Sequence, residues 1–140
     1  MQEVVVDASV VVKWFVEEED SNKALKIRDK YIEGEIRVIA PNIITYEILN
    51  ALYHKRLFSE SELCGVSEAL DSFLFNLYPL KGEYAKRTVT TSFENDITVY
   101  DSAYISLAII KNTYLYTADD KLIERLKKNY LKHVKNIRDI

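Results

Sequence analysis

The stretch Val4-Val5-Val6-Asp7-Ala8-Ser9 (VVVDAS) decides the fold class. Three consecutive β-branched residues without polar alternation are typical of a strand that is covered on both faces, as strands are in parallel sheets. An aspartate follows the run directly, so a carboxylate stands just beyond the carboxyl end of the strand. Ligands of open parallel sheets bind outside those ends. The stretch therefore predicts a buried parallel strand with Asp7 at the functional edge of its sheet.

Segments with strand and helix patterns alternate along the rest of the chain. Gly34 marks the end of the first long helix, Ser59 and Glu62 have capping-box spacing, and Thr98 can open a late helix. The expected helices cover about 21–32, 43–52, 59–76, 83–93, 98–110 and 120–131, and the expected strands cover 4–6, 36–40, 77–80, 113–117 and 133–137. This alternation predicts one three-layer α/β/α domain over residues 1–140, with a mostly parallel central sheet of four to five strands.

The composition is that of a globular protein. The chain has 140 residues, of which 48% are hydrophobic and 29% charged, which is enough to build a buried core. No apolar run approaches the roughly 18 residues that span a membrane, and the first residues lack the features of a signal peptide. The single Cys64 excludes an internal disulfide framework and fits a reducing compartment. We therefore expect a cytoplasmic protein without membrane association.

Charge is distributed unevenly along the chain. Residues 121–138 contain seven basic and one acidic side chain, whereas residues 1–120 contain twelve basic and twenty acidic ones. This asymmetry fits an acidic site beside a basic flank. A solvated, lysine-rich terminal helix explains the basic part equally well.

Three acidic residues lie where a site could form. Asp7 follows the first strand and Asp119 follows the strand at 113–117, so parallel strands would bring both to one edge of the sheet. Each also has a local explanation, because Asp7 could start a turn and Asp119 could cap the next helix. Glu47 borders the apolar stripe of its helix, where an unpaired charge is costly, so it needs a site or a basic partner. Asn50, one turn further on, could hydrogen-bond a neighbouring carboxylate.

A fourth acid, Asp101, lies in TVYDSAYISLA, residues 98–108. Together with Thr98 it has the spacing of a capping box, and the helix dipole favours an acid in the first turn by about 0.3–1 kcal/mol. The helix behind it is apolar almost all round, which indicates a buried element. A capping role and membership of a site are therefore compatible.

Four converging carboxylates would repel one another and bind protons more tightly. A hard divalent cation relieves this repulsion, and Mg²⁺ and Mn²⁺ prefer carboxylate oxygens and retained waters. His54 and His133 are isolated and Cys64 is single, so zinc is not indicated. No Ser–His–acid set and no glycine-rich phosphate loop is present. The acids therefore predict a Mg²⁺ or Mn²⁺ site.

Four segments carry a resemblance to a known family: VVVDASVVVKWF, ITYEILNAL, TVYDSAYISLA and LYTADDKL. In this order the chain resembles, from residue 4 to about 137, the PIN-domain ribonucleases, specifically the VapC-like toxins of type II toxin–antitoxin pairs. The family's four acids fall on Asp7, Glu47, Asp101 and Asp119, its hydroxyl residue after the first acid on Ser9, its helical asparagine on Asn50 and its threonine before the last acid on Thr117. Two further acids near the motifs, Asp96 and Asp120, are assigned to helix ends or supporting positions.

The resemblance implies hydrolysis of RNA phosphodiester bonds with one or two Mg²⁺ or Mn²⁺ ions. Asp7 and Asp101 would be the most direct ligands, while Glu47 and Asp119 would hold a second ion or its waters and orient the nucleophile. Basic side chains would steer the anionic RNA backbone. The candidates are Lys13, Arg87, Lys121, Arg125, Lys127 and Lys128.

The resemblance also implies a small antitoxin that covers the acidic cleft, and a homodimer. Trp14 and Phe15 suit either an interface or the core. Two other functions stay open, a non-catalytic binding module with the same fold and a phosphoacceptor receiver domain. A receiver would need paired acids after the first strand and a lysine after a late strand, where this chain has a single acid and Ala118-Asp119.

Overall fold

Strand β1 (Gln2–Val6) lies at the centre of a five-stranded sheet in the computed structural model, which describes all 140 residues. The strand order is β3-β2-β1-β4-β5, and every neighbouring pair is parallel. The other strands are β2 (Ile36–Pro41), β3 (Asn76–Tyr78), β4 (Leu115–Thr117) and β5 (Val134–Asn136). Residues 4–6 are completely buried, because helices cover both faces of the sheet at this strand. The predicted α/β class with a mostly parallel sheet is confirmed.

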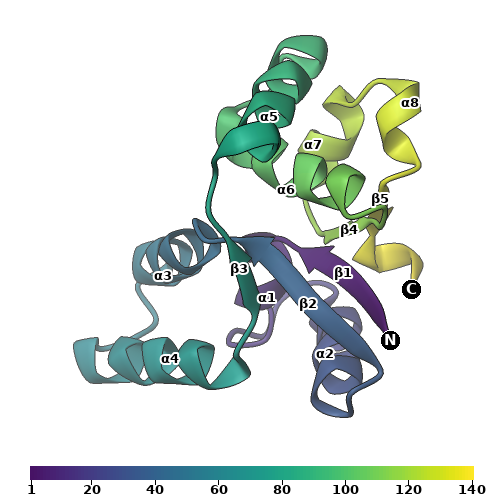
Figure 1. Ribbon diagram of the computed structural model, residues 1–140. Helices are drawn as coiled ribbons and strands as arrows, with labels where there is room; N and C mark the ends of the chain where they lie inside the picture. Colours follow the sequence, from purple (N-terminus) through teal and green to yellow (C-terminus); the bar gives the residue numbers. More distant parts are fainter.

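Helices flank the sheet on both sides (Figure 1). Helix α6 packs against β1, β2 and β4, and α5 packs on the outside of α6, whereas α2 packs against β2 and α1 against β4 on the other side. Helix α3 lies beside α1, and α4 beside α3. None of the helices has the length and apolar character needed to cross a bilayer. The helices are α1 (Ala8–Val12), α2 (Ser21–Ile32), α3 (Ile44–Lys55), α4 (Glu60–Phe73), α5 (Gly82–Asn95), α6 (Val99–Ile110), α7 (Asp120–Arg125) and α8 (Lys128–Leu131), with a final 3₁₀ turn at Ile137–Asp139.

Helix α1 was not predicted from the sequence. Its valines favour strand structure, but the side chain of Asp7 accepts a hydrogen bond from Val10 N and caps the helix. Val10, Val11 and Val12 are all buried, so tertiary packing outweighs their weak helix propensity. This short helix turns the chain sharply after β1 and keeps Asp7 at the edge of the sheet.

Two predicted helices and one predicted strand have boundaries that differ from the structure. Helix α4 begins at the predicted Ser59–Glu62 capping box but ends at Phe73, because Leu74 adopts a left-handed conformation with φ of 55°, and β3 therefore ends before Pro79. The predicted basic helix over 120–131 is two helices, since Leu126 and Lys127 are extended. Lys127 N donates to Asn95 Oδ1 at 2.9 Å, and this long-range hydrogen bond stabilises the extended backbone between the two helices.

Trp14 belongs to the core. Its side chain is 8% exposed, and its indole Nε1 donates to the carbonyl of Ala24 at 2.8 Å. The rings of Phe73 and Phe75 contact it edge-on at centroid distances of 5.2 and 5.9 Å. Of the two roles considered for this tryptophan, packing is the one that the structure supports.

Candidate functional site

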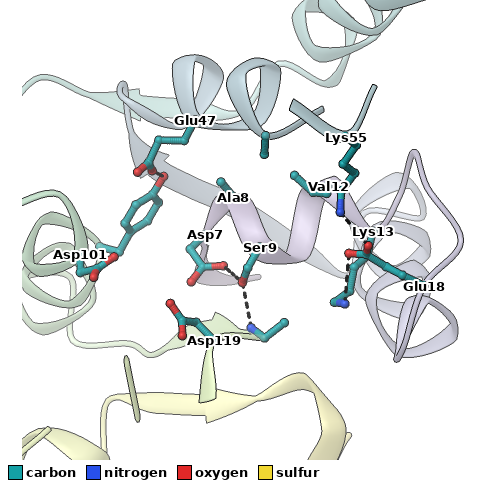
Figure 2. A pocket seen from close by; sticks show the side chains of 13 residues that line it. Asp7, Ala8, Ser9, Val12, Lys13, Glu18, Glu47, Lys55, Asp101 and Asp119 are labelled. Carbon is teal, nitrogen blue, oxygen red and sulfur yellow. Dashed lines mark hydrogen bonds and ion pairs between the residues drawn. The ribbon is translucent and has the colours of Figure 1, made fainter. Parts of the chain in front are cut away.

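The sheet register brings the predicted acids to one cleft. Val5 and Val6 of β1 pair with Leu115 and Tyr116 of β4, so the two strands end side by side. Beyond their ends lies a cleft of about 420 Å³ that contains all four predicted carboxylates (Figure 2). Its lining residues are Asp7, Ala8, Ser9, Val12, Lys13, Glu18, Glu47, Ala51, Lys55, Asp101, Tyr104, Ala118 and Asp119.

Asp7 is the most buried of these acids, with a relative exposure of 7%. The hydroxyls of Ser9 and Thr117 donate to Oδ1 and Oδ2 of its carboxylate, and Val10 N donates to Oδ1 at 3.3 Å. Burial raises the pKa of Asp7 to about 6, against the lowering effect of these hydrogen bonds, and the charge of Asp119 adds to the rise. The side chain is thus held in place while its charged form remains incompletely compensated.

The same two hydroxyls also hold the chain after β4. Ser9 Oγ accepts from Ala118 N at 2.9 Å, and Thr117 Oγ1 accepts from Asp119 N at 3.0 Å. Each hydroxyl proton is therefore directed to Asp7 while its lone pair receives a backbone N–H. The structure brings Ser9 and Thr117, expected in supporting positions, directly against Asp7.

Asp119 and Asp101 lie at the starts of helices α7 and α6. Asp119 Oδ1 accepts from Leu122 N at 3.1 Å as the helix cap, which leaves Oδ2 without a protein partner. For α6 the cap is Thr98, whose hydroxyl accepts from Asp101 N at 3.0 Å, and the reciprocal bond of a full capping box is absent. The carboxylate of Asp101 is therefore free to face the cleft. Burial raises its pKa, and the charge of Asp119 raises it further.

Glu47 lies in the first turn of α3 and has no basic partner. Instead, the hydroxyl of Tyr104 on α6 donates to Glu47 Oε1 at 2.5 Å. Burial raises the pKa of Glu47, and the nearby charge of Asp101 contributes to the rise. The structural ion pair that the sequence left open is therefore ruled out, and the carboxylate is oriented by a tyrosine.

Several residues singled out in the sequence lie outside this cleft. Asn50 is exposed and is not part of the cleft lining. Asp96 ends α5 as its C-cap, and Asp120 accepts from Asn136 and pairs with Arg138 at 2.6 Å. These two acids serve helix ends and surface pairing, as expected for groups beside the motifs.

The structure adds three cleft residues that the sequence did not indicate, Tyr104, Glu18 and Lys55. Tyr104 lies three residues after Asp101, on the same side of α6, and Lys55 lies two turns after Glu47 on α3. Helical spacing is the signal that could have found both. Glu18 follows α1 in a non-helical segment, so no periodicity could have placed it.

The donor set fits a hard divalent cation. All four carboxylates face one cleft, none forms an ion pair with a lysine or arginine, and three of them have raised pKa values. No three acidic, histidine or cysteine side chains stand close enough together to be a completed metal centre. Carboxylates that share a cleft without forming such a centre suit an ion that keeps part of its water shell, as Mg²⁺ does.

Comparisons with known proteins agree with this geometry. The model of the PIN domain family matches residues 4–129. A protein named ribonuclease VapC3, from Pyrobaculum aerophilum, is 30% identical over 126 residues, which cover 87% of this chain and 93% of that protein.

Solved structures share the fold at low sequence identity. The FitAcB structure from Neisseria gonorrhoeae matches with a TM-score of 0.70 at 15% identity, covering 98% of this chain and 99% of the other. VapBC2 from Rickettsia felis, bound to a DNA fragment from its promoter, matches with a TM-score of 0.66 at 16% identity, covering 96% and 98%.

Proposed function

The chain belongs to the PIN-domain family, and from this premise we propose that it is a metal-dependent endoribonuclease, the toxin of a toxin–antitoxin pair. The relative that matches nearly the whole chain is named a ribonuclease. One solved structure with the same fold, from Klebsiella pneumoniae, is described as a toxin–antitoxin complex; it matches with a TM-score of 0.65 at 15% identity. The observation that carries the proposal is the cleft at the ends of β1 and β4, which gathers four carboxylates, none of which forms an ion pair with a lysine or arginine.

Asp7, Glu47, Asp101 and Asp119 are the residues that would hold Mg²⁺ or Mn²⁺. When bound, such an ion lowers the pKa of a water ligand and neutralises charge that develops on a phosphate. The charges of Asp7 and Asp101 are each coupled to that of Asp119, and Glu47 is coupled to Asp101. The charge of Asp119 therefore acts on both of the other aspartates, which favours binding of one cation by these three carboxylates.

The nucleophile of the proposed hydrolysis is water, because the cleft offers no free side-chain nucleophile. It contains no histidine or cysteine, and the Ser9 hydroxyl already donates to Asp7 and accepts from Ala118 N. Glu47 would orient that water through Oε2, because the Tyr104 hydroxyl occupies only Oε1. Burial raises the pKa of Tyr104, so this hydroxyl keeps its proton and continues to orient Glu47.

The partners of this function are RNA, a small antitoxin and a second copy of the chain. The structural neighbour described as a toxin–antitoxin complex supports the antitoxin, which would cover the acidic cleft. Exposed aromatic side chains, among them Tyr46 and Tyr100 with exposures of 74% and 59%, offer surface for protein contacts. A cytoplasmic location accompanies this proposal.

The test is cleavage of RNA by the purified protein, with mapped product ends. We expect cleavage with Mg²⁺ or Mn²⁺, none with EDTA, and a loss of at least 100-fold in Asp7→Asn and Asp101→Asn. Asp96→Asn is the matched control, because Asp96 is an exposed acid outside the cleft. Full activity in Asp7→Asn would contradict the site assignment. Metal binding without cleavage of any RNA would favour the non-catalytic binding module.

A further inference from the structure

The cleft has two electrically different ends. Helix α1 has Asp7 at its N-cap and Lys13 at its C-cap, and helix α3 has Glu47 in its first turn and Lys55 as its last residue. The two helices pack against each other, and in Figure 2 both lysines lie at the end of the cleft opposite Glu47 and Asp101. An acidic end and a basic end therefore share one cavity.

The residue spacing along α3 places an acidic and a basic side chain on the same face of this helix, at opposite ends of the cleft. Glu47, Ala51 and Lys55 follow one another at intervals of four residues, and all three line the cleft. Eight residues of helix rise by roughly 12 Å, so Lys55 stands about that far along the helix axis from Glu47. A ligand that fills the whole cleft therefore meets carboxylates at one end and ammonium groups at the other.

Glu18 joins the two lysines. Lys13 Nζ lies 3.3 Å from Glu18 Oε1, and Lys55 Nζ lies 2.9 Å from Glu18 Oε2. Lys13 Nζ also donates to the carbonyl oxygen of Glu19 at 2.7 Å. Each carboxylate oxygen thus takes one lysine from a different helix, and the side chains of Lys55 and Glu18 remain 32% and 33% exposed to an incoming ligand.

We propose that Lys13 and Lys55 hold an RNA phosphate next to the scissile one, and that Glu18 occupies the position of this phosphate until RNA binds. The proposal rests on the ribonuclease function proposed above. A phosphodiester carries one negative charge on two unesterified oxygens, as a carboxylate does, so it can take the same two lysines. Lysine ammonium groups bind phosphates as point charges with three donors each.

The exchange of Glu18 for phosphate is physically reasonable. The Lys55–Glu18 pair is about one-third exposed on both sides and adds little to stability, because water competes for both partners, whereas the Lys13 side chain is 12% exposed. Lys55 uses one of its three donors on Glu18, so it can contact the phosphate before Glu18 leaves. The released Glu18 lies on the non-helical segment between α1 and α2, where a side chain can turn to solvent.

A purely structural role makes a different prediction. If the ion pairs of Glu18 only hold the segment after α1 against helix α3, then loss of Glu18 or of either lysine should weaken this same contact. All three variants would then change activity in the same direction. A phosphate site predicts opposite signs, because the lysines attract RNA and Glu18 competes with it.

The experiment measures KM and kcat for a 5′-labelled single-stranded RNA that the wild type cleaves, at several salt concentrations. We expect Lys13→Ala and Lys55→Ala to raise KM about 5- to 20-fold at low salt with kcat within twofold. Glu18→Gln should lower KM about threefold or more. Lys55→Arg should restore most of the loss. Lys30→Ala and Glu68→Gln, exposed residues outside the cleft with the same charge changes, serve as matched controls.

Binding measurements separate this inference from the ribonuclease function. Each lysine that contacts a phosphate should contribute about 0.7 to the slope of log K against log salt for single-stranded RNA. If the wild type cleaves RNA but the lysine variants keep their KM and salt slope, the phosphate site is wrong and the ribonuclease stands. If the wild type cleaves no RNA, a shallower slope in both lysine variants still supports the site, and an unchanged slope overturns it. A higher KM in Glu18→Gln, with a lower melting temperature, would show that Glu18 has a structural role and does not compete with RNA.

Discussion

Replacement of Asp7 by asparagine should remove activity and make the metal-free protein more stable at neutral pH. Asp7 is buried, and its pKa is raised from 3.8 to about 6, so the charged form is costly in the folded state. A group whose pKa is higher in the folded state binds its proton more tightly there, so folding is favoured at low pH. This stability is fully present below about pH 3.8 and is lost as the pH rises towards 6.

The magnitude follows from the size of this shift. A rise in the pKa of Asp7 from 3.8 to about 6 lowers the free energy of unfolding by about 3 kcal/mol between low pH and neutral pH. Asparagine is an equally good helix cap, but its amide presents one acceptor where the carboxylate accepts from both Ser9 and Thr117. The lost hydrogen bond costs about 1 kcal/mol at every pH. The free energy of unfolding of Asp7→Asn is therefore expected to exceed that of the wild type by about 1–2 kcal/mol at pH 7.5 in EDTA.

The assay is urea denaturation of the wild type and of Asp7→Asn at pH 4 and pH 7.5, both in EDTA. The variant should be equal or less stable at pH 4 and more stable at pH 7.5. Glu47 and Asp101 titrate in both proteins, so their contributions largely cancel in the difference. A stability difference that does not change with pH would refute the claim that burial of the Asp7 charge opposes folding.

Three further predictions concern the groups around the acids. Tyr104→Phe removes the donor to Glu47 Oε1, so kcat should fall about tenfold while the melting temperature changes little, as measured by steady-state cleavage and thermal denaturation. Thr117→Val removes the donor to Asp7 and the acceptor of Asp119 N, so the free energy of unfolding should fall by about 1–3 kcal/mol in urea titrations. Mn²⁺ should bind roughly tenfold more weakly at pH 5 than at pH 7 in calorimetry, because Asp7, with its pKa of about 6, must lose its proton first. Equal Mn²⁺ affinity at both pH values would remove Asp7 from the metal site.

The sequence contains the information for most of the fold because its strongest signals are local. The uninterrupted Val4–Val6 run marks a strand buried on both faces, and the Ser59–Glu62 pair marks a helix start; both are present as predicted. The break at Leu126 and Lys127 could not be predicted, since no glycine or proline stands there. It depends on a hydrogen bond that Lys127 N donates to Asn95 Oδ1, thirty-two residues earlier in the chain.

The difference between local signals and long-range contacts applies to the site as well. Asp7, Asp101 and Asp119 could be found because each follows a strand or begins a helix, and Glu47 could be found because it borders the apolar stripe of its helix. Which side chain pairs with which could not be predicted, because Tyr104 and Glu47 are fifty-seven residues apart and Glu18 meets Lys55 across thirty-seven. Only the tertiary structure shows that a tyrosine, and not a lysine, is the partner of Glu47. Sequence patterns therefore locate charged groups, whereas the fold determines what compensates them.

The placement of the four acids explains how the fold tolerates them without a cation. Asp7 and Asp119 are N-caps of α1 and α7, and Glu47 and Asp101 lie in the first turns of α3 and α6. All four therefore lie at helix N-termini, where the dipole favours negative charge by about 0.3–1 kcal/mol each. That contribution is incomplete, because the pKa values of Asp7, Glu47 and Asp101 are still raised by burial and by neighbouring carboxylates. The helix dipoles lower the cost of assembling the cluster, and the repulsion that remains would be relieved by a bound cation.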